Sequence, residues 1–65
     1  MRLKELRTAH NLSQKQLADV LGTTARAISF YENGLREPNI AALIALADYF
    51  GVSVDYLLGR TDQPG

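Results

Sequence analysis

The chain contains no cysteine and no tryptophan, and its 65 residues include only two prolines and one histidine. Without cysteine it can form no disulfide and no thiolate metal site, so a fold of this size must rely on packing alone. A single histidine supplies neither a metal site nor a catalytic pair. The acidic residues show no paired spacing, and the glycines fall singly and form no phosphate-binding loop. We therefore expect no enzyme, no metal and no cofactor.

Long hydrophobic runs are also missing. The most apolar stretch, Ile40–Phe50, contains Asp48 and falls well short of the roughly 20 residues that cross a membrane. Met1 leads directly into a charged segment, which does not fit a signal peptide. These absences predict a cytoplasmic protein that does not associate with a membrane.

The chain has no net charge, but its charges are unevenly distributed. Residues 1–36 carry six basic and three acidic side chains, whereas residues 37–65 carry one basic and four acidic side chains. The N-terminal part could therefore face phosphate groups while the C-terminal part faces away or meets a partner. Because the imbalance is small in so short a chain, a chance distribution is the alternative.

Capping residues and hydrophobic periodicity divide the chain into five helical segments. Ser13 followed by Gln16 has the spacing of a capping box, and glycines or Asn11 stand at the expected helix ends. The predicted segments are Arg2–His10, Ser13–Gly22, Ala25–Asn33, Ile40–Phe50 and Val54–Leu58. In the fourth segment the residues expected to face the core are Ile40, Leu43, Leu46, Ala47 and Phe50. We expect one all-α domain over residues 1–59, and a flexible tail or linker over residues 60–65.

The segment from Ser13 to Gly34 has the demanding spacing of two short helices that cross closely. Ala18 is small where two helix backbones must approach, and Gly22 can adopt the positive φ of a tight turn. Ile28 then packs the second helix onto the first. The remaining inward positions are filled by Leu17, Leu21 and Tyr31.

This pattern resembles the Cro/CI-type helix-turn-helix family of phage and bacterial repressors, also called the xenobiotic-response-element family. The resemblance covers Leu3–Gly59 and includes LSQKQLA, YENG before the loop to Pro38, and FGVSVDYLLG. It implies an all-α, lambda-repressor-like domain of five helices whose third helix enters the major groove of double-stranded DNA. It also implies a transcriptional regulator, most simply a repressor that blocks polymerase by occupying a phage or bacterial operator.

The resemblance also implies roles for individual residues. The outward face of the third helix, which would read bases, consists of Ala25, Arg26, Ser29 and Phe30. The residues expected beside phosphates are Gln14, Lys15, Thr24, Asn33 and Arg36, each of which is otherwise an ordinary polar surface or capping residue. Arg7 and Glu32 match an ion pair that ties the first helix to the end of the third.

Arg26 is the foremost candidate for base contact, because a guanidinium can bond both O6 and N7 of guanine. A phosphate contact or a solvated side chain are the alternatives. Phe30 and Ala25 depart from the polar residues that the family often has at these positions. Phe30 has three interpretations: contact with thymine methyl groups, a protein interface, or packing back over Tyr31 and the core.

The last two predicted helices carry more apolar side chains than one small core needs, and the family often dimerises through its C-terminal part. Candidate interface residues are Tyr49, Val54 and Tyr56. Since one recognition helix reads few bases, we expect a homodimer, at least on DNA, with a palindromic site whose halves lie about 34 Å apart. The alternative function is a protein-interaction module or antitoxin-like subunit on the same fold, which the zero net charge, Ala25 and Phe30 would suit.

Overall fold

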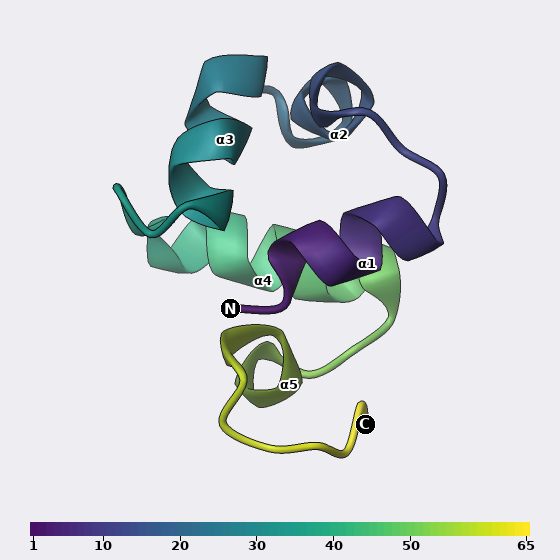
Figure 1. Cartoon of the computed structure of the whole chain (residues 1–65). Coiled ribbons are helices and arrows are strands. Elements are labelled where there is room, and N and C mark those ends of the chain that lie inside the picture. The colour runs from purple at the N-terminus through teal and green to yellow at the C-terminus, as the bar shows by residue number, and fades with distance from the viewer.

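Every regular element of the chain is an α-helix (Figure 1). The computed structural model describes residues 1–65, and none of its helices has both the length and the apolar character needed to cross a membrane. The helices are α1 (Leu3–Ala9), α2 (Gln14–Leu21), α3 (Ala25–Glu32), α4 (Ile40–Phe50) and α5 (Val54–Leu58). The predicted all-α class and order of helices are confirmed. The bounds of α4 and α5 are those predicted, α1 and α2 are shorter by one residue at each end, and α3 is shorter by one residue at its C-terminal end.

Side-chain caps start every helix except α1. The Ser13 hydroxyl accepts a 3.0 Å hydrogen bond from the Gln16 N–H, and the Gln16 side chain accepts a 2.8 Å bond from the Ser13 N–H. This is the predicted capping box. The bond from the third residue of the helix to the cap side chain is also made by Thr24, Asn39 and Ser53. At the start of α1, the backbone N–H of Arg2 instead donates to the Leu57 carbonyl at 2.8 Å, which joins the two ends of the fold.

Each helix contributes at least one side chain to a single hydrophobic core. The buried apolar residues are Leu3, Leu17, Ala18, Ile28, Leu46, Ala47, Phe50 and Leu57. Leu6, Leu21, Tyr31 and Leu43 pack against this cluster and are partly buried. The inward faces predicted from periodicity therefore form the core, with one exception.

Ile40 is wrongly predicted as a core residue, because its side chain is 75% exposed. Each residue advances about 100° around a helix, so Ile40 lies roughly 70° from the mean direction of the other four predicted positions. It is also the first residue of α4, beyond the part of the helix that the core covers. Ile40 therefore lies at the edge of the apolar stripe and on the surface.

The α2–α3 unit and the C-terminal part of the chain lie at opposite ends of the molecule (Figure 1). α2 and α3 lie together at one end, where they form the most extensive contact between any two helices. α1 and α4 occupy the middle, and α5 with residues 60–65 lies at the other end. The α2–α3 unit is therefore separated from the C-terminal part of the chain.

Residues 60–65 fold back on α5 and on the start of the chain. The Pro64 carbonyl accepts a 2.7 Å hydrogen bond from the Ser53 N–H. The guanidinium of Arg2 donates to the Thr61 carbonyl at 3.1 Å and to the Asp62 carboxylate at 2.8 Å. The division of the chain into a domain of residues 1–59 and a flexible tail stays a prediction.

A nearly buried ion pair joins α1 to the end of α3. Arg7 Nε lies 2.6 Å from Glu32 Oε2, and Arg7 Nη2 lies 3.3 Å from Glu32 Oε1. Arg7 Nη1 also donates to the Leu12 carbonyl at 2.7 Å, and Gln14 Nε2 donates to Glu32 Oε1 at 3.1 Å. The Glu32 side chain is only 3% exposed. One carboxylate therefore connects α3 with both α1 and α2.

Replacing Arg7 with alanine should destabilise the fold far more than replacing Lys4, an exposed basic residue on the same helix. Arg7→Ala leaves the Glu32 carboxylate buried without a cation, a change that costs about 3 kcal/mol or more. For a domain of this size the melting temperature should fall by roughly 10 °C or more. Thermal denaturation followed by circular dichroism measures both variants. Equal melting temperatures for Arg7→Ala and Lys4→Ala would contradict this expectation.

Candidate nucleic-acid interface

α2 and α3 form a helix-turn-helix unit with a tight turn over residues 22–24. Gly22 has φ 73° and ψ 32°, a left-handed conformation that glycine adopts without strain. A Cβ built at Gly22 would meet nothing within 4 Å, so the backbone conformation and not the available space accounts for this glycine. Leu17, Ala18 and Ile28 are buried between the helices and the rest of the core. The unit therefore holds α3 in a fixed orientation with one face outward.

The outward face of α3 carries the four residues predicted to read bases. Arg26 is exposed, whereas Ala25, Ser29 and Phe30 are half-buried. The Ser29 hydroxyl accepts a 3.3 Å hydrogen bond from Asn33 Nδ2, which also donates to the Ser29 carbonyl at 2.9 Å. This face therefore presents one cation, one hydroxyl and two apolar groups.

Phe30 contacts two arginines from its place on α3. The guanidinium carbons of Arg26 and Arg36 each lie 5.3 Å from the centroid of the Phe30 ring. The ring is not among the core residues or those packed against the core. Of its three interpretations, packing over the core is therefore wrong, because the side chain lies against the two cations on the surface.

Ion pairing divides the basic residues into two groups. Arg2, Arg7, Lys15 and Arg60 each lie within 4 Å of a carboxylate. Lys4, Arg26 and Arg36 form no ion pair, and no side-chain hydrogen bond from them is present. The two arginines in this second group are those at Phe30. Although the chain is neutral overall, positive charge without a partner is therefore concentrated at the exposed face of α3.

The start of α2 offers backbone donors as well as side chains. The N–H groups of Gln14 and Lys15 donate to no acceptor in the structure, and such groups at a helix N-terminus attract anions. The Gln14 amide turns inward to Glu32, while the Lys15 ammonium is exposed and lies 3.8 Å from Asp19. Thr24 uses its hydroxyl oxygen to cap α3. This end of the unit is therefore suited to a phosphate, mainly through its backbone.

The loop after α3 brings Arg36 back to the same surface. Gly34 has φ 71°, and the N–H groups of Leu35 and Arg36 both donate to the Phe30 carbonyl, at 2.9 and 3.3 Å. Arg36 itself is exposed. The turn therefore returns the chain to α3 and sets Arg36 near Arg26.

The residues predicted for a dimer interface are unevenly exposed. Tyr49 is 43% exposed, and its ring meets the Phe50 ring edge-on with centroids 5.1 Å apart. Val54 packs against the core, and the Tyr56 ring lies 4.5 Å from the Arg2 guanidinium carbon. Only Tyr49 therefore presents much apolar surface to a partner.

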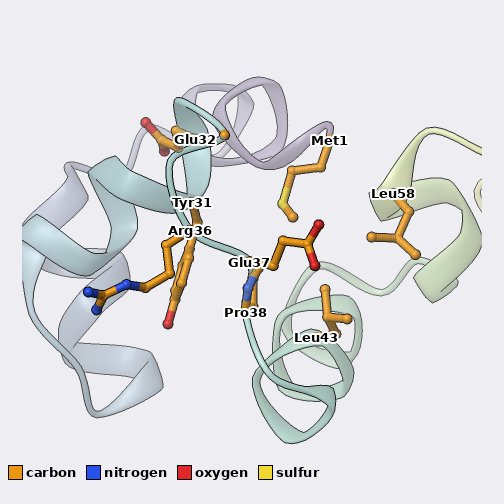
Figure 2. A pocket seen from close by; sticks show the side chains of 9 residues that line it. Met1, Tyr31, Glu32, Arg36, Glu37, Pro38, Leu43 and Leu58 are labelled. Carbon is orange, nitrogen blue, oxygen red and sulfur yellow. The ribbon is translucent and has the colours of Figure 1, made fainter.

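A cavity of about 550 Å³ opens between the α3–α4 loop and the N-terminus. Figure 2 shows Met1, Glu37, Leu43 and Leu58 pointing toward one another across it, while Arg36 extends away. No cluster of three or more His, Cys, Asp or Glu side chains that could hold a metal ion is present. Arg36 is one of the residues that line this cavity, although its side chain extends away from it, whereas Arg26 does not line it.

The sequence did not predict that both arginines would contact Phe30. Arg26 and Phe30 are four residues apart, the helical spacing at which side chains meet, so this contact had a signal in the sequence. Arg36 lies beyond the turn at Gly34, and its contact depends on the conformation of the loop. No local pattern marks that second contact.

Comparison with known proteins places these features in a family. A sequence model of the helix-turn-helix family matches residues 3–57. The uncharacterized HTH-type transcriptional regulator YobD of Bacillus subtilis (strain 168) is 43% identical over 63 residues, which are 97% of this chain and 56% of that protein. The HTH-type transcriptional regulator AnsR from the same organism is 45% identical over 62 residues, 95% of this chain and 53% of AnsR.

The prophage-derived regulator YonR of the same strain is 43% identical over 60 residues, 92% of this chain and 56% of YonR. The chain thus spans about half the length of these relatives. No solved structure matches it significantly. The family match covers every helix except the last residue of α5, and it includes the turn at Gly22 and the outward face of α3. The chain therefore belongs to the Cro/CI-type helix-turn-helix family.

Proposed function

We propose that this domain binds double-stranded DNA sequence-specifically and regulates transcription. The observation that carries the proposal is the position of Arg26 and Arg36, the only arginines without an ion pair, at the exposed face of α3. Nearby carboxylates compensate the other arginines, so the zero net charge does not describe this surface. Membership of the helix-turn-helix family supports the same function.

α3 has the size that the major groove of DNA accepts. With its side chains an α-helix is about 10–12 Å in diameter, and the groove is about 12 Å wide. In this arrangement Arg26 binds O6 and N7 of a guanine, and the Ser29 hydroxyl bonds a neighbouring base edge. Ala25 and Phe30 have no polar group for a base, and the methyl group of Ala25 favours contact with a thymine methyl group. Because α3 carries few polar side chains that can read bases, we expect modest base specificity, and the shape of the DNA contributes the rest of the sequence preference.

Phosphate contacts on both sides of α3 complete the interface. Gln14 and Lys15 supply free backbone N–H groups at the start of α2, and Lys15 adds an exposed positive charge. Thr24 lies at the start of α3, while Asn33 and Arg36 lie beyond its end. These five residues stand at the start of α2, at the start of α3 and beyond the end of α3. They would grip the DNA backbone and orient α3 in the groove.

A homodimer on a palindromic operator would extend the interface to two half-sites about 34 Å apart. The candidate contacts are Tyr49, Val54 and Tyr56, of which Tyr49 is the most exposed. Because α5 lies at the opposite end from the α2–α3 unit, pairing there would leave both recognition helices free (Figure 1). Residues 1–59 form the DNA-binding domain in this proposal, and residues 60–65 are a tail or linker.

Regulation then follows from occupancy, since a domain bound across an operator excludes polymerase in the cytoplasm. A protein-interaction or antitoxin-like role on the same fold is the second candidate. The half-buried Phe30 and the neutral chain favour it. The two functions differ in their dependence on salt.

Affinity for duplex DNA should fall steeply as salt is raised. Each phosphate contact contributes about −0.9 to the slope of log K against log salt concentration. Fluorescence anisotropy with a labelled duplex between low and moderate salt measures this slope. Absence of binding to any duplex at low salt would favour the protein-interaction role instead.

Selection from a random duplex library should enrich a site with two-fold symmetry. The centres of its half-sites should be about 10 base pairs apart, or a multiple of this spacing, because each subunit presents one α3 to the same side of the DNA. Sequencing of the enriched pool provides the measurement. A single asymmetric half-site would be evidence for binding as a monomer.

Arg26→Ala and Arg36→Ala should weaken binding in different ways. Loss of a guanine contact at Arg26 should cost about 1–3 kcal/mol on the selected site and relax the preference at one base position. Loss of a phosphate contact at Arg36 should weaken all sequences equally and make the salt slope less steep by about 1. Lys4→Ala removes the other unpaired cation and serves as the control. Uniform weakening by Arg26→Ala would assign that residue to phosphate.

A further inference from the structure

Phe30 holds two cationic side chains against one aromatic ring. The guanidinium carbons of Arg26 and Arg36 are both 5.3 Å from its centroid. This is within the range of about 6 Å in which the negative face of a ring attracts a cation. Because the two carbons share one centroid, they are separated by no more than twice that distance. The ring lies outside the core, so core packing does not account for an aromatic residue here.

The backbone of Phe30 also fixes the position of Arg36. The Phe30 carbonyl accepts hydrogen bonds from the N–H groups of Leu35 and Arg36. The left-handed turn at Gly34 makes this return possible. Leu35 is 74% exposed, so its apolar side chain does little to hold the turn. The carbonyl and the ring of one residue therefore place Arg36, while Arg26 reaches the same ring from one helical turn away.

Contact with the ring leaves the donors of both guanidiniums available. A phenyl ring offers no oxygen acceptor, and neither side chain takes part in a hydrogen bond or ion pair in the structure. Two like charges held close together repel each other, and an anionic ligand relieves that repulsion. A free arginine also loses rotamer freedom when it binds, and an arginine already held on a ring loses less. The pair is therefore arranged in advance for acceptors outside the protein.

We propose that Phe30 is a positioning residue that holds Arg26 and Arg36 together as one DNA-binding pair. The inference rests on the DNA binding proposed above, with Arg26 on a guanine edge and Arg36 on a nearby phosphate. Phe30 then acts through the two arginines, without bonding a base itself. Base preference at the position read by Arg26 depends on the ring for this reason.

NMR spectra of the free chain test the positioning without DNA. The ring current of Phe30 should displace the side-chain resonances of Arg26 and Arg36 from their ordinary positions. Phe30→Leu should abolish this displacement, whereas Phe30→Tyr, which keeps the ring, should preserve it. Arg60 pairs with Asp55 and should be unaffected in both variants. Unchanged resonances of Arg26 and Arg36 in Phe30→Leu would overturn the proposal.

DNA binding then tests whether the positioning matters. On the selected duplex, Phe30→Leu should weaken binding about five- to tenfold and relax the preference at the base read by Arg26. Phe30→Tyr should stay within about twofold of the native chain. In the Arg26→Ala/Arg36→Ala background, measured at low salt, Phe30→Leu should have no further effect, because the ring then has no cation to position.

The comparison of Phe30→Leu in the two backgrounds also distinguishes the alternative roles of Phe30. An equal loss in the arginine-free background overturns the proposal, and a loss confined to sites with thymine assigns the ring to direct methyl contact. A large fall in the melting temperature of Phe30→Leu, with the same loss in every background, assigns it to the fold. A native chain that binds no duplex overturns the proposed function together with this role. A chain that binds DNA while Phe30→Leu binds equally well overturns the role of Phe30 alone.

Discussion

The orientation of α3 depends on the carboxylate of Glu32. This group lies at the end of α3, is almost fully buried, and accepts bonds from Arg7 on α1 and Gln14 on α2. A buried ion pair contributes little net stability compared with apolar packing, but it accepts only a narrow set of geometries. The Arg7–Glu32 ion pair therefore acts mainly by fixing the orientation of α3. It holds the C-terminal end of α3, while the turn at Gly22 and the packing of Ala18 hold the N-terminal end.

This arrangement also decides which charges are available at the surface. Arg7 is paired with Glu32. Arg2 and Arg60 are paired with aspartates in the C-terminal part of the chain. The arginines that remain unpaired, and are therefore available to a ligand, lie where α3 and the following loop meet. Net charge is a poor guide to the partner of such a chain, because compensation is local and the two unpaired arginines share one face. Arg26 and Arg36 therefore remain unpaired at Phe30, while the other arginines are paired with carboxylates elsewhere in the fold.

Much of the fold follows from short-range features of the sequence. The capping box at Ser13 and the caps at the other helix starts lie within three residues of their partners, so the helix bounds were predicted to within one residue. Ile40 shows the limit of periodicity, because the pattern places a residue on a helix face but does not show how far the neighbouring helices extend over it. At the candidate site the resemblance to the family predicts which residues of α3 read bases, and their role stays a prediction. The contact of Phe30 with Arg36 was not predicted.

The sequence by itself determined the five helices, the tight turn at Gly22 and the inward faces, because these depend on interactions within about one helical turn. The tertiary structure decided which arginines are paired and where Phe30 lies. Arg7 and Glu32 are 25 positions apart, and Arg2 and Asp62 are 60 apart, so their pairing exists only after the helices have packed. The face of α3 is therefore encoded locally in its residues, but its free charge is a property of the whole fold.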